Sequence, residues 1–125
     1  MPTFVGIYIY PDVEVLDFTG PYEVFTTATR LALRDGQPPP FSTSTIAARK
    51  GLVRARAGLV VQPNYNFANH PPIDLLIIPG GVVTSELENP EVVRWSYVPY
   101  HLYSVFPVLA SRRILHTIQW GKHLL

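Results

Sequence analysis

The chain has 125 residues, which is enough for one domain and too few for two. Hydrophobic residues make up 47% of it and charged residues 15%, a balance that favours a packed core and argues against wholesale disorder. A net charge of +1 argues against a general nucleic-acid binder, and the lack of cysteine excludes disulfides, thiolate metal sites and thiol nucleophiles within these residues.

The amino-terminal segment does not have the pattern of a secretory signal. Residues 1–6 carry no basic side chain ahead of their apolar run, and Asp12, Glu14 and Asp17 follow closely. No uninterrupted apolar stretch approaches the roughly 20 residues of a membrane-spanning helix. The sequence therefore predicts a cytoplasmic protein that does not interact with membranes.

Residues 4–10, FVGIYIY, form the first predicted strand, because a nearly continuous apolar run suits a strand buried on both faces of a parallel sheet. A helix is predicted over 22–33, where apolar residues recur at helical spacing. Thr19 or Asp17 is the expected cap of this helix, and Pro21 suits its first turn, where a missing N–H is harmless.

The next elements are two further strands. Asp35-Gly36 signals the end of the helix, and prolines at 38–40 form a stiff connector. The second strand is predicted over residues 41–47. Residues 52–61 alternate between basic and apolar side chains, which predicts a third strand with one solvated face and a bulge or turn near Gly58.

Basic side chains at 49, 50, 54 and 56 also allow a nucleic-acid interface in this region. Such an interface usually interleaves aromatic residues that stack on bases, and none is interleaved here. The solvated face of a strand is therefore the preferred interpretation.

Residues 73–79, IDLLIIP, give the clearest buried strand, and Gly80-Gly81 follows it directly. A second helix is predicted over 84–95, with apolar side chains on one side and glutamates on the other. One strand, a helix, three strands and a helix in this order are typical of an α/β layered domain with a largely parallel sheet.

The last thirty residues differ in kind from the rest. Residues 1–95 hold all nine acidic and seven of the ten basic residues, a net charge of −2, whereas 96–125 hold three basic residues and no acid. Residues 96–125 also lack a sustained period of 2 or 3.6. The plain interpretation is a terminal strand and loop. We expect a domain-like part over 1–95 and a divergent tail over 96–125, which a reading-frame slip or mis-splicing would explain.

Two polar features follow predicted strands, where ligands of open α/β sheets bind. Asp17 comes soon after the first strand, and Gly80-Gly81 directly follows the strand 73–79. Consecutive glycines can expose backbone N–H groups to an anion or a developing oxyanion. Each feature also has a plain explanation, because an aspartate before a helix is often a cap and Gly-Gly is often a tight turn.

The four histidines do not have the paired spacing of a zinc site, so structural or solvated roles are expected for them. The chain also lacks the glycine-rich phosphate loop and the G-x-S-x-G nucleophile motif. The sequence therefore predicts no metal and no cofactor.

Together these pieces resemble the DJ-1/PfpI superfamily, whose members are similar to class I glutamine amidotransferases. The resemblance is carried by V-x-x-L-D-x-x-G-P over 13–21 and D-L-L-I-I-P-G-G over 74–81. Within the superfamily the chain looks most similar to isonitrile hydratases and to the sensor domains of AraC-type regulators. The resemblance implies a flavodoxin-like three-layer sandwich, usually dimeric, with a cysteine on a sharp turn from strand to helix.

The resemblance also implies roles for individual residues. In isonitrile hydratases the cysteine thiolate attacks the isonitrile carbon, and water then gives an N-substituted formamide. The acid matching Asp17 lies beside the cysteine and handles its proton or that of the attacking water. The backbone N–H groups of Gly80 and Gly81 would help line the pocket.

The match fails where the family reads S-V-C-T-G, because Phe106 stands near the position of the cysteine and Pro107 follows it. Phenylalanine has no proton to lose and no lone pair to donate. We therefore expect a partial domain, truncated before the nucleophile turn and catalytically inactive, in which Asp17 is a vestigial acid/base partner. Residual activity through Asp17 alone is a weaker possibility, because loss of a nucleophile costs several orders of magnitude in rate.

The alternative function is a non-enzymatic ligand-sensing or dimerisation module, similar to the sensor half of an AraC-type regulator. Such a module would bind a small molecule and form a homodimer. The sequence has no helix-turn-helix segment, so it predicts no direct contact with nucleic acid.

Overall fold

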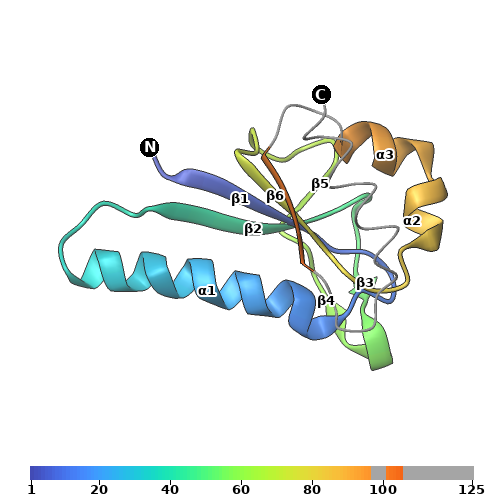
Figure 1. Ribbon diagram of the computed structural model, residues 1–125, viewed down its shortest axis with the longest axis horizontal. Helices are drawn as coiled ribbons and strands as arrows, with labels where there is room; N and C mark the ends of the chain where they lie inside the picture. The colour runs from blue at the N-terminus through green and yellow to red at the C-terminus, as the bar shows by residue number, and fades with distance from the viewer. Residues whose placement is uncertain (97–100, 106–125) are drawn as a thin grey trace.

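The computed structural model describes residues 1–96 and 101–105, the last five by their backbone alone. Its centre is a parallel five-stranded sheet with the strand order β5-β2-β1-β6-β7 (Figure 1). The strands are β1 (Thr3–Tyr8), β2 (Phe41–Ala47), β5 (Tyr65–Asn66), β6 (Leu75–Pro79) and β7 (His101–Val105). The predicted α/β class with a mainly parallel sheet is confirmed.

Three helices flank this sheet within the described part of the chain. The long helix α1 (Val15–Arg34) runs along one side of the sheet, and the short helices α2 (Thr84–Glu88) and α3 (Pro90–Ser96) lie on the other side (Figure 1). None of the helices in this part is long and apolar enough to cross a lipid bilayer.

The core surrounds β1, the middle strand of the sheet. Ile7 and Tyr8, whose side chains point to opposite faces of β1, are both buried, as expected for a strand covered on both faces. A β-carbon on Gly6 would lie only 2.8 Å from Cδ1 of Ile46 on β2. Glycine at position 6 therefore lets the Ile46 side chain reach across the central strand.

The start of α1 lies seven residues before the predicted start at residue 22. The prediction placed Pro21 in the first turn, but Pro21 lies inside the helix. Phe18 is buried against the core and Val15 packs beside it. Burial of two apolar side chains outweighs the lost N–H of Pro21, so the helix begins at Val15.

The predicted caps of α1 are also wrong. Glu14 is the N-cap residue and makes no side-chain capping bond, while Asp17 lies in the first turn of the helix. The Thr19 hydroxyl donates to the Val15 carbonyl oxygen over 2.7 Å. Thr19 and Asp17 are therefore both helical residues, and neither one caps the helix.

The end of α1 agrees with the prediction at Asp35-Gly36. Gly36 has a φ of +74°, and the N–H of Gln37 donates to the Ala32 carbonyl over 2.8 Å. This is the hydrogen-bond pattern of a Schellman motif, which favours glycine at the left-handed position.

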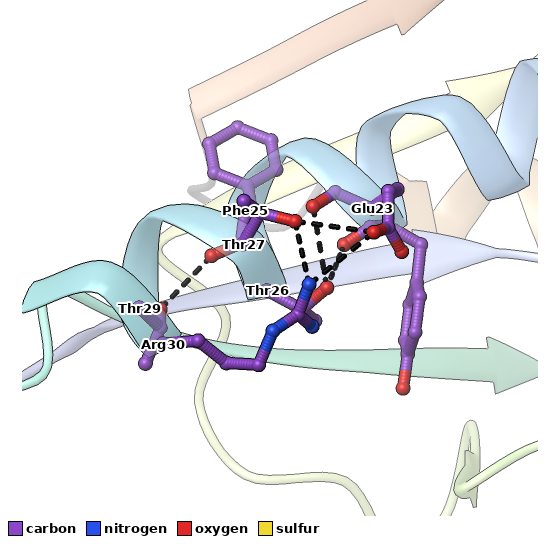
Figure 2. Close-up of polar contacts among 7 residues, drawn as sticks. Glu23, Phe25, Thr26, Thr27, Thr29 and Arg30 are labelled. Carbon is purple, nitrogen blue, oxygen red and sulfur yellow. Dashed lines mark hydrogen bonds and ion pairs between the residues drawn. The ribbon is translucent and has the colours of Figure 1, made fainter. Parts of the chain in front are cut away.

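Polar side chains on α1 contact one another near the middle of the helix, as Figure 2 shows. Arg30 lies 3.3 Å from the Glu23 carboxylate and 2.8 Å from the Thr27 hydroxyl. On the sheet side, the Thr29 hydroxyl is 3.1 Å from the carbonyl oxygen of Phe41, the first residue of β2. The hydroxyl of Thr29 thus links the helix directly to the sheet.

The predicted single strand over 52–61 is wrong. The segment forms a small antiparallel hairpin of β3 (Val53–Arg54) and β4 (Val60–Val61), separated by the 3-10 turn η1 (Arg56–Gly58). Ala57 and Gly58 have φ values of +59° and +91°, so the backbone reverses there. The turn expected near Gly58 is therefore confirmed, but the strand does not continue through it.

The predicted helix over 84–95 is divided between α2 and α3. Asn89 has extended backbone angles, as expected for a residue that precedes a proline. The Asn89 side-chain oxygen accepts the Glu91 N–H over 3.0 Å, and Pro90 is the first residue of α3. Asn89-Pro90 is thus a cap followed by an N-terminal proline, a helix-start signal that the sequence analysis missed.

Candidate functional site at the carboxyl edge of β1 and β6

The strand order reverses at β1. The chain passes from β1 to β2 on one side and later returns to β6 on the other side of β1. Ligands of open α/β sheets bind outside the carboxyl ends of the strands at such a switch point. The candidate site is therefore where the chain leaves β1 and β6.

The loop 9–14 after β1 packs against the two glycines after β6. The N–H of Glu14 donates to the Gly80 carbonyl over 2.9 Å. Gly81 has a φ of +154°, and a β-carbon there would lie 2.8 Å from the Asp12 carbonyl oxygen. Close backbone packing therefore requires glycine at position 81. The predicted ligand-binding role of the Gly80 and Gly81 N–H groups stays a prediction.

The hairpin of β3 and β4 holds the same loop from another side. The Asp12 N–H donates to the Arg54 carbonyl, and the Arg56 N–H donates to the Val13 carbonyl, each over 3.0 Å. An exposed ion pair of 3.6 Å between the Arg56 and Glu14 side chains adds to these contacts. The amino end of α1, with Asp17, is fixed in place by this loop.

Asp17 lies in the first turn of α1 and is only partly buried as a residue. Its Oδ2 atom is buried and has no hydrogen-bond partner among the described residues. Burial raises the pKa of the Asp17 carboxyl, and the negative charge of Glu14 raises it further. The neutral acid is thereby favoured relative to an exposed aspartate.

Two tyrosines that the sequence analysis did not single out lie at the same edge. The Tyr8 hydroxyl donates to Oε2 of Glu86 over 2.5 Å, and the Tyr10 hydroxyl donates to the Pro79 carbonyl over 2.7 Å. Their rings stack with centroids 5.3 Å apart. The sequence signal that could have indicated them is the pair of tyrosines, with their hydroxyl groups, at the end of an otherwise apolar strand.

Burial raises the pKa of both phenols far above the ordinary value, and the Glu86 carboxylate raises them further. The charges of Asp17 and Glu14 also raise the pKa of Tyr10. The Tyr10 hydroxyl therefore lies within electrostatic reach of acids on both sides of the edge.

A cavity of about 230 Å³ opens beside these tyrosines. Its polar lining comes from Tyr8, Tyr10, Arg49, Lys50, Glu86 and Asn89. Cations, a carboxylate and phenolic hydroxyls can together bind a small polar molecule. Asp17, Gly80 and Gly81 do not line this cavity, so the site residues predicted from the sequence lie outside its wall.

An aromatic cluster supports the sheet beneath α3. The rings of Phe67 and Trp95 stack with centroids 4.2 Å apart, and Trp95 also lies against Tyr8. The Trp95 Nε1–H donates to Nε2 of His70 over 2.8 Å, and Nδ1 of His70 lies 2.7 Å from the Pro71 carbonyl oxygen. His70 thus has the structural role expected for it.

The predicted nucleophile position, Phe106, lies outside the described residues. The backbone of β7 leads to it, since Val105 pairs with Pro79 in parallel register. The end of β7 therefore lies beside Pro79, the last residue of β6. Over residues 1–96, no three histidine or acidic side chains come together in a way that could hold a metal ion.

No family model matches the chain. It is 29% identical over 91 residues to an isonitrile hydratase of Pseudomonas putida, a match that covers 70% of this chain and 34% of that enzyme. The chain thus spans about a third of the length of this curated relative.

Two solved structures show the same fold. A ThiJ/PfpI family protein from Pseudomonas syringae superposes with a TM-score of 0.68 at 18% identity, covering 83% of this chain and 42% of that one. An AraC family transcriptional regulator from Pseudomonas putida superposes with a TM-score of 0.52 at 20% identity, covering 65% and 48% of the two chains. The resemblance drawn from the sequence is confirmed for the fold.

Proposed function

We propose that this chain, which has part of the DJ-1/ThiJ/PfpI fold and is a distant homologue of isonitrile hydratase, does not carry out thiol-dependent catalysis. The absence of cysteine from all 125 residues is the observation on which this proposal rests. Hydration of an isonitrile through a thiolate needs a sulfur nucleophile, which these residues do not supply.

The environment of Asp17 supports the proposal. In a thiol-bearing site, a carboxyl group at this place would exchange protons with the nucleophile. Asp17 keeps the raised pKa that such a task needs, because it is partly buried and lies near Glu14. With no thiol to serve, it is the vestigial acid/base partner of the proposed reaction.

The second candidate function is binding of a small polar molecule without turnover. The cavity beside Tyr8 and Tyr10 favours it, because its lining combines Arg49 and Lys50 with Glu86. The likeness of the fold to an AraC family transcriptional regulator supports a sensing role for such a cavity. The homodimer predicted from the resemblance stays a prediction; Leu16 and Val24, exposed on α1, would suit it.

The test is hydration of an alkyl isonitrile by the purified 125-residue chain, followed by the appearance of the formamide. The isonitrile hydratase of Pseudomonas putida serves as the positive control. We expect no rate above the buffer background, and the same background for Asp17→Asn. A rate comparable to that of the control enzyme would overturn the proposal.

A further inference from the structure

A second and larger cavity, of about 440 Å³, lies at the carboxyl ends of β2 and β5. Its walls come from the loop 49–52 after β2 and from the segment 62–69 around β5. Arg49, Lys50 and Leu52 line both cavities, but Asp17, Gly80 and Gly81 do not line this one, so it is separate from the thiol-dependent site considered above.

The side-chain oxygens of three asparagines in its wall accept hydrogen bonds from backbone N–H groups. Oδ1 of Asn64 accepts the N–H of Thr45, Oδ1 of Asn66 accepts the N–H of Ala68, and Oδ1 of Asn69 accepts the N–H of Asn66, each over 2.8 Å. Because a backbone N–H can only donate, these bonds fix which amide atom is the oxygen.

The hydrogen bonds found among the described residues leave the Nδ2 groups of these asparagines unused. An asparagine amide has one acceptor oxygen and one NH2 donor group. The three NH2 groups can therefore donate hydrogen bonds to a ligand, while each oxygen is already engaged within the fold. The amide wall of this cavity is therefore suited to a ligand that accepts hydrogen bonds.

The charged residues around the cavity also favour a ligand that accepts hydrogen bonds, and specifically an anion. Arg49 and Lys50 line it, and no acidic residue among those described does. Arg49 lies 3.3 Å from the Glu91 carboxylate in an exposed ion pair, so part of its charge is compensated. Lys50 makes no ion pair with another described residue. Its charge remains available to an anion.

The cavity is large enough for more than an inorganic ion. Its volume falls near the lower end of the range of small-molecule sites, about 300–1,000 Å³. Leu52, Pro63 and Tyr65 add an apolar part to the wall. We propose that this cavity binds a small phosphorylated molecule, with the phosphate on the Lys50 and asparagine donors and the organic part against Tyr65.

The test is a binding titration of the full chain with phenyl phosphate, inorganic phosphate and benzoate, followed by the side-chain amide signals of the asparagines in NMR spectra. We expect phenyl phosphate to bind most tightly and to shift the NH2 signals of Asn64, Asn66 and Asn69. Tighter binding of benzoate than of phenyl phosphate would contradict a phosphate site, as would shifts confined to other parts of the chain.

Asn66→Asp is the decisive variant, because aspartate keeps the oxygen that accepts the Ala68 N–H, loses the NH2 donor and adds a negative charge. We expect this variant and Lys50→Gln each to weaken phenyl phosphate binding by roughly tenfold or more. Gln37→Glu makes the same change of charge just beyond α1, at the opposite end of the sheet, and should leave the affinity unchanged. Equal affinities for the four proteins would overturn the proposal, as would no binding at all.

Discussion

Gly81 and Asp12 pack so closely that a β-carbon on Gly81 would lie 2.8 Å from the Asp12 carbonyl oxygen. The contact joins the turn after β6 to the loop after β1. It involves backbone atoms on the Asp12 side, so a rotamer change cannot relieve a clash. The two ends of the candidate site are therefore joined by a contact that tolerates only glycine.

Gly81→Ala should destabilise the protein by about 3 kcal/mol, because the added methyl group meets backbone atoms and the residue has a φ of +154°. Gly51→Ala is the matched control. Gly51 has a φ of +122°, and a β-carbon added to it would meet no atom within 4 Å, so only the backbone strain remains, about 1 kcal/mol. Urea unfolding measures both values, and equal losses would contradict the close contact.

Asp17→Asn should make the protein more stable at neutral pH. Burial raises the pKa of Asp17 in the folded state above its ordinary value of 3.8, so the folded protein holds this proton more tightly than the unfolded chain does. The stabilisation is fully present below pH 3.8 and is lost as the pH rises through the raised pKa. Urea unfolding at several pH values should show the advantage of the variant growing over that window.

Glu88→Gln removes a charge from an exposed residue of α2 and serves as the control for Asp17→Asn. Its stability should follow that of the unchanged protein at each pH. If Asp17→Asn behaves in the same way as Glu88→Gln, burial of the Asp17 carboxyl has no energetic effect.

Tyr8 and Tyr10 should resist ionisation in alkaline solution. Burial raises the pKa of both phenols above the ordinary 10.0, so the folded state keeps two protons that the unfolded chain releases. Stability contributed by these phenols is present below pH 10 and falls as the pH rises further. Phenolate absorbance should show at least two of the seven tyrosines ionising only when the protein unfolds.

Tyr8→Phe and Tyr10→Phe should each remove one of these delayed tyrosines from the titration. Tyr22→Phe, in an exposed residue of α1, is the control and should leave the number of delayed tyrosines unchanged. A titration in which all tyrosines ionise together, with the fold intact, would contradict the buried hydrogen bonds.

Trp95→Phe should cost about 1 kcal/mol, because it keeps a ring stacked on Phe67 and loses the N–H donated to His70. The same hydrogen bond predicts the tautomer of His70. Its Nε2 accepts from Trp95, so the proton is on Nδ1, which donates to the Pro71 carbonyl. The nitrogen chemical shifts of the His70 ring report which nitrogen carries the proton. A proton on Nε2 would contradict the hydrogen bond from Trp95.

The sequence was sufficient for elements whose side chains show one strong pattern. Residues 73–79 are mostly apolar, so a buried strand of a parallel sheet could be predicted there, and the β-branched residues of 41–47 were enough to predict a strand. Helix boundaries needed tertiary information. Nothing local shows that Phe18 will be buried against the core, and this burial is what carries α1 past Pro21.

The candidate site was predictable only in part. Asp17 and Gly81 lie at the expected edge, since the carboxyl ends of parallel strands meet there. The Tyr8–Glu86 pair joins residues 78 positions apart, and no local pattern reports such a contact. The division of the predicted helix 84–95 at Asn89 could have been predicted from the sequence, because an asparagine before a proline is a common helix start.

The hairpin of β3 and β4 looks peripheral, yet it holds the loop that carries α1 through the Arg54 carbonyl and the Arg56 N–H. An opening fluctuation of this hairpin would release the Asp12 and Arg56 amides to solvent in the same event. Hydrogen exchange at these two positions should therefore proceed at matched rates, even though they are 44 residues apart in the chain. The turn at Ala57 and Gly58 would then govern how often the amino end of α1 is free to move.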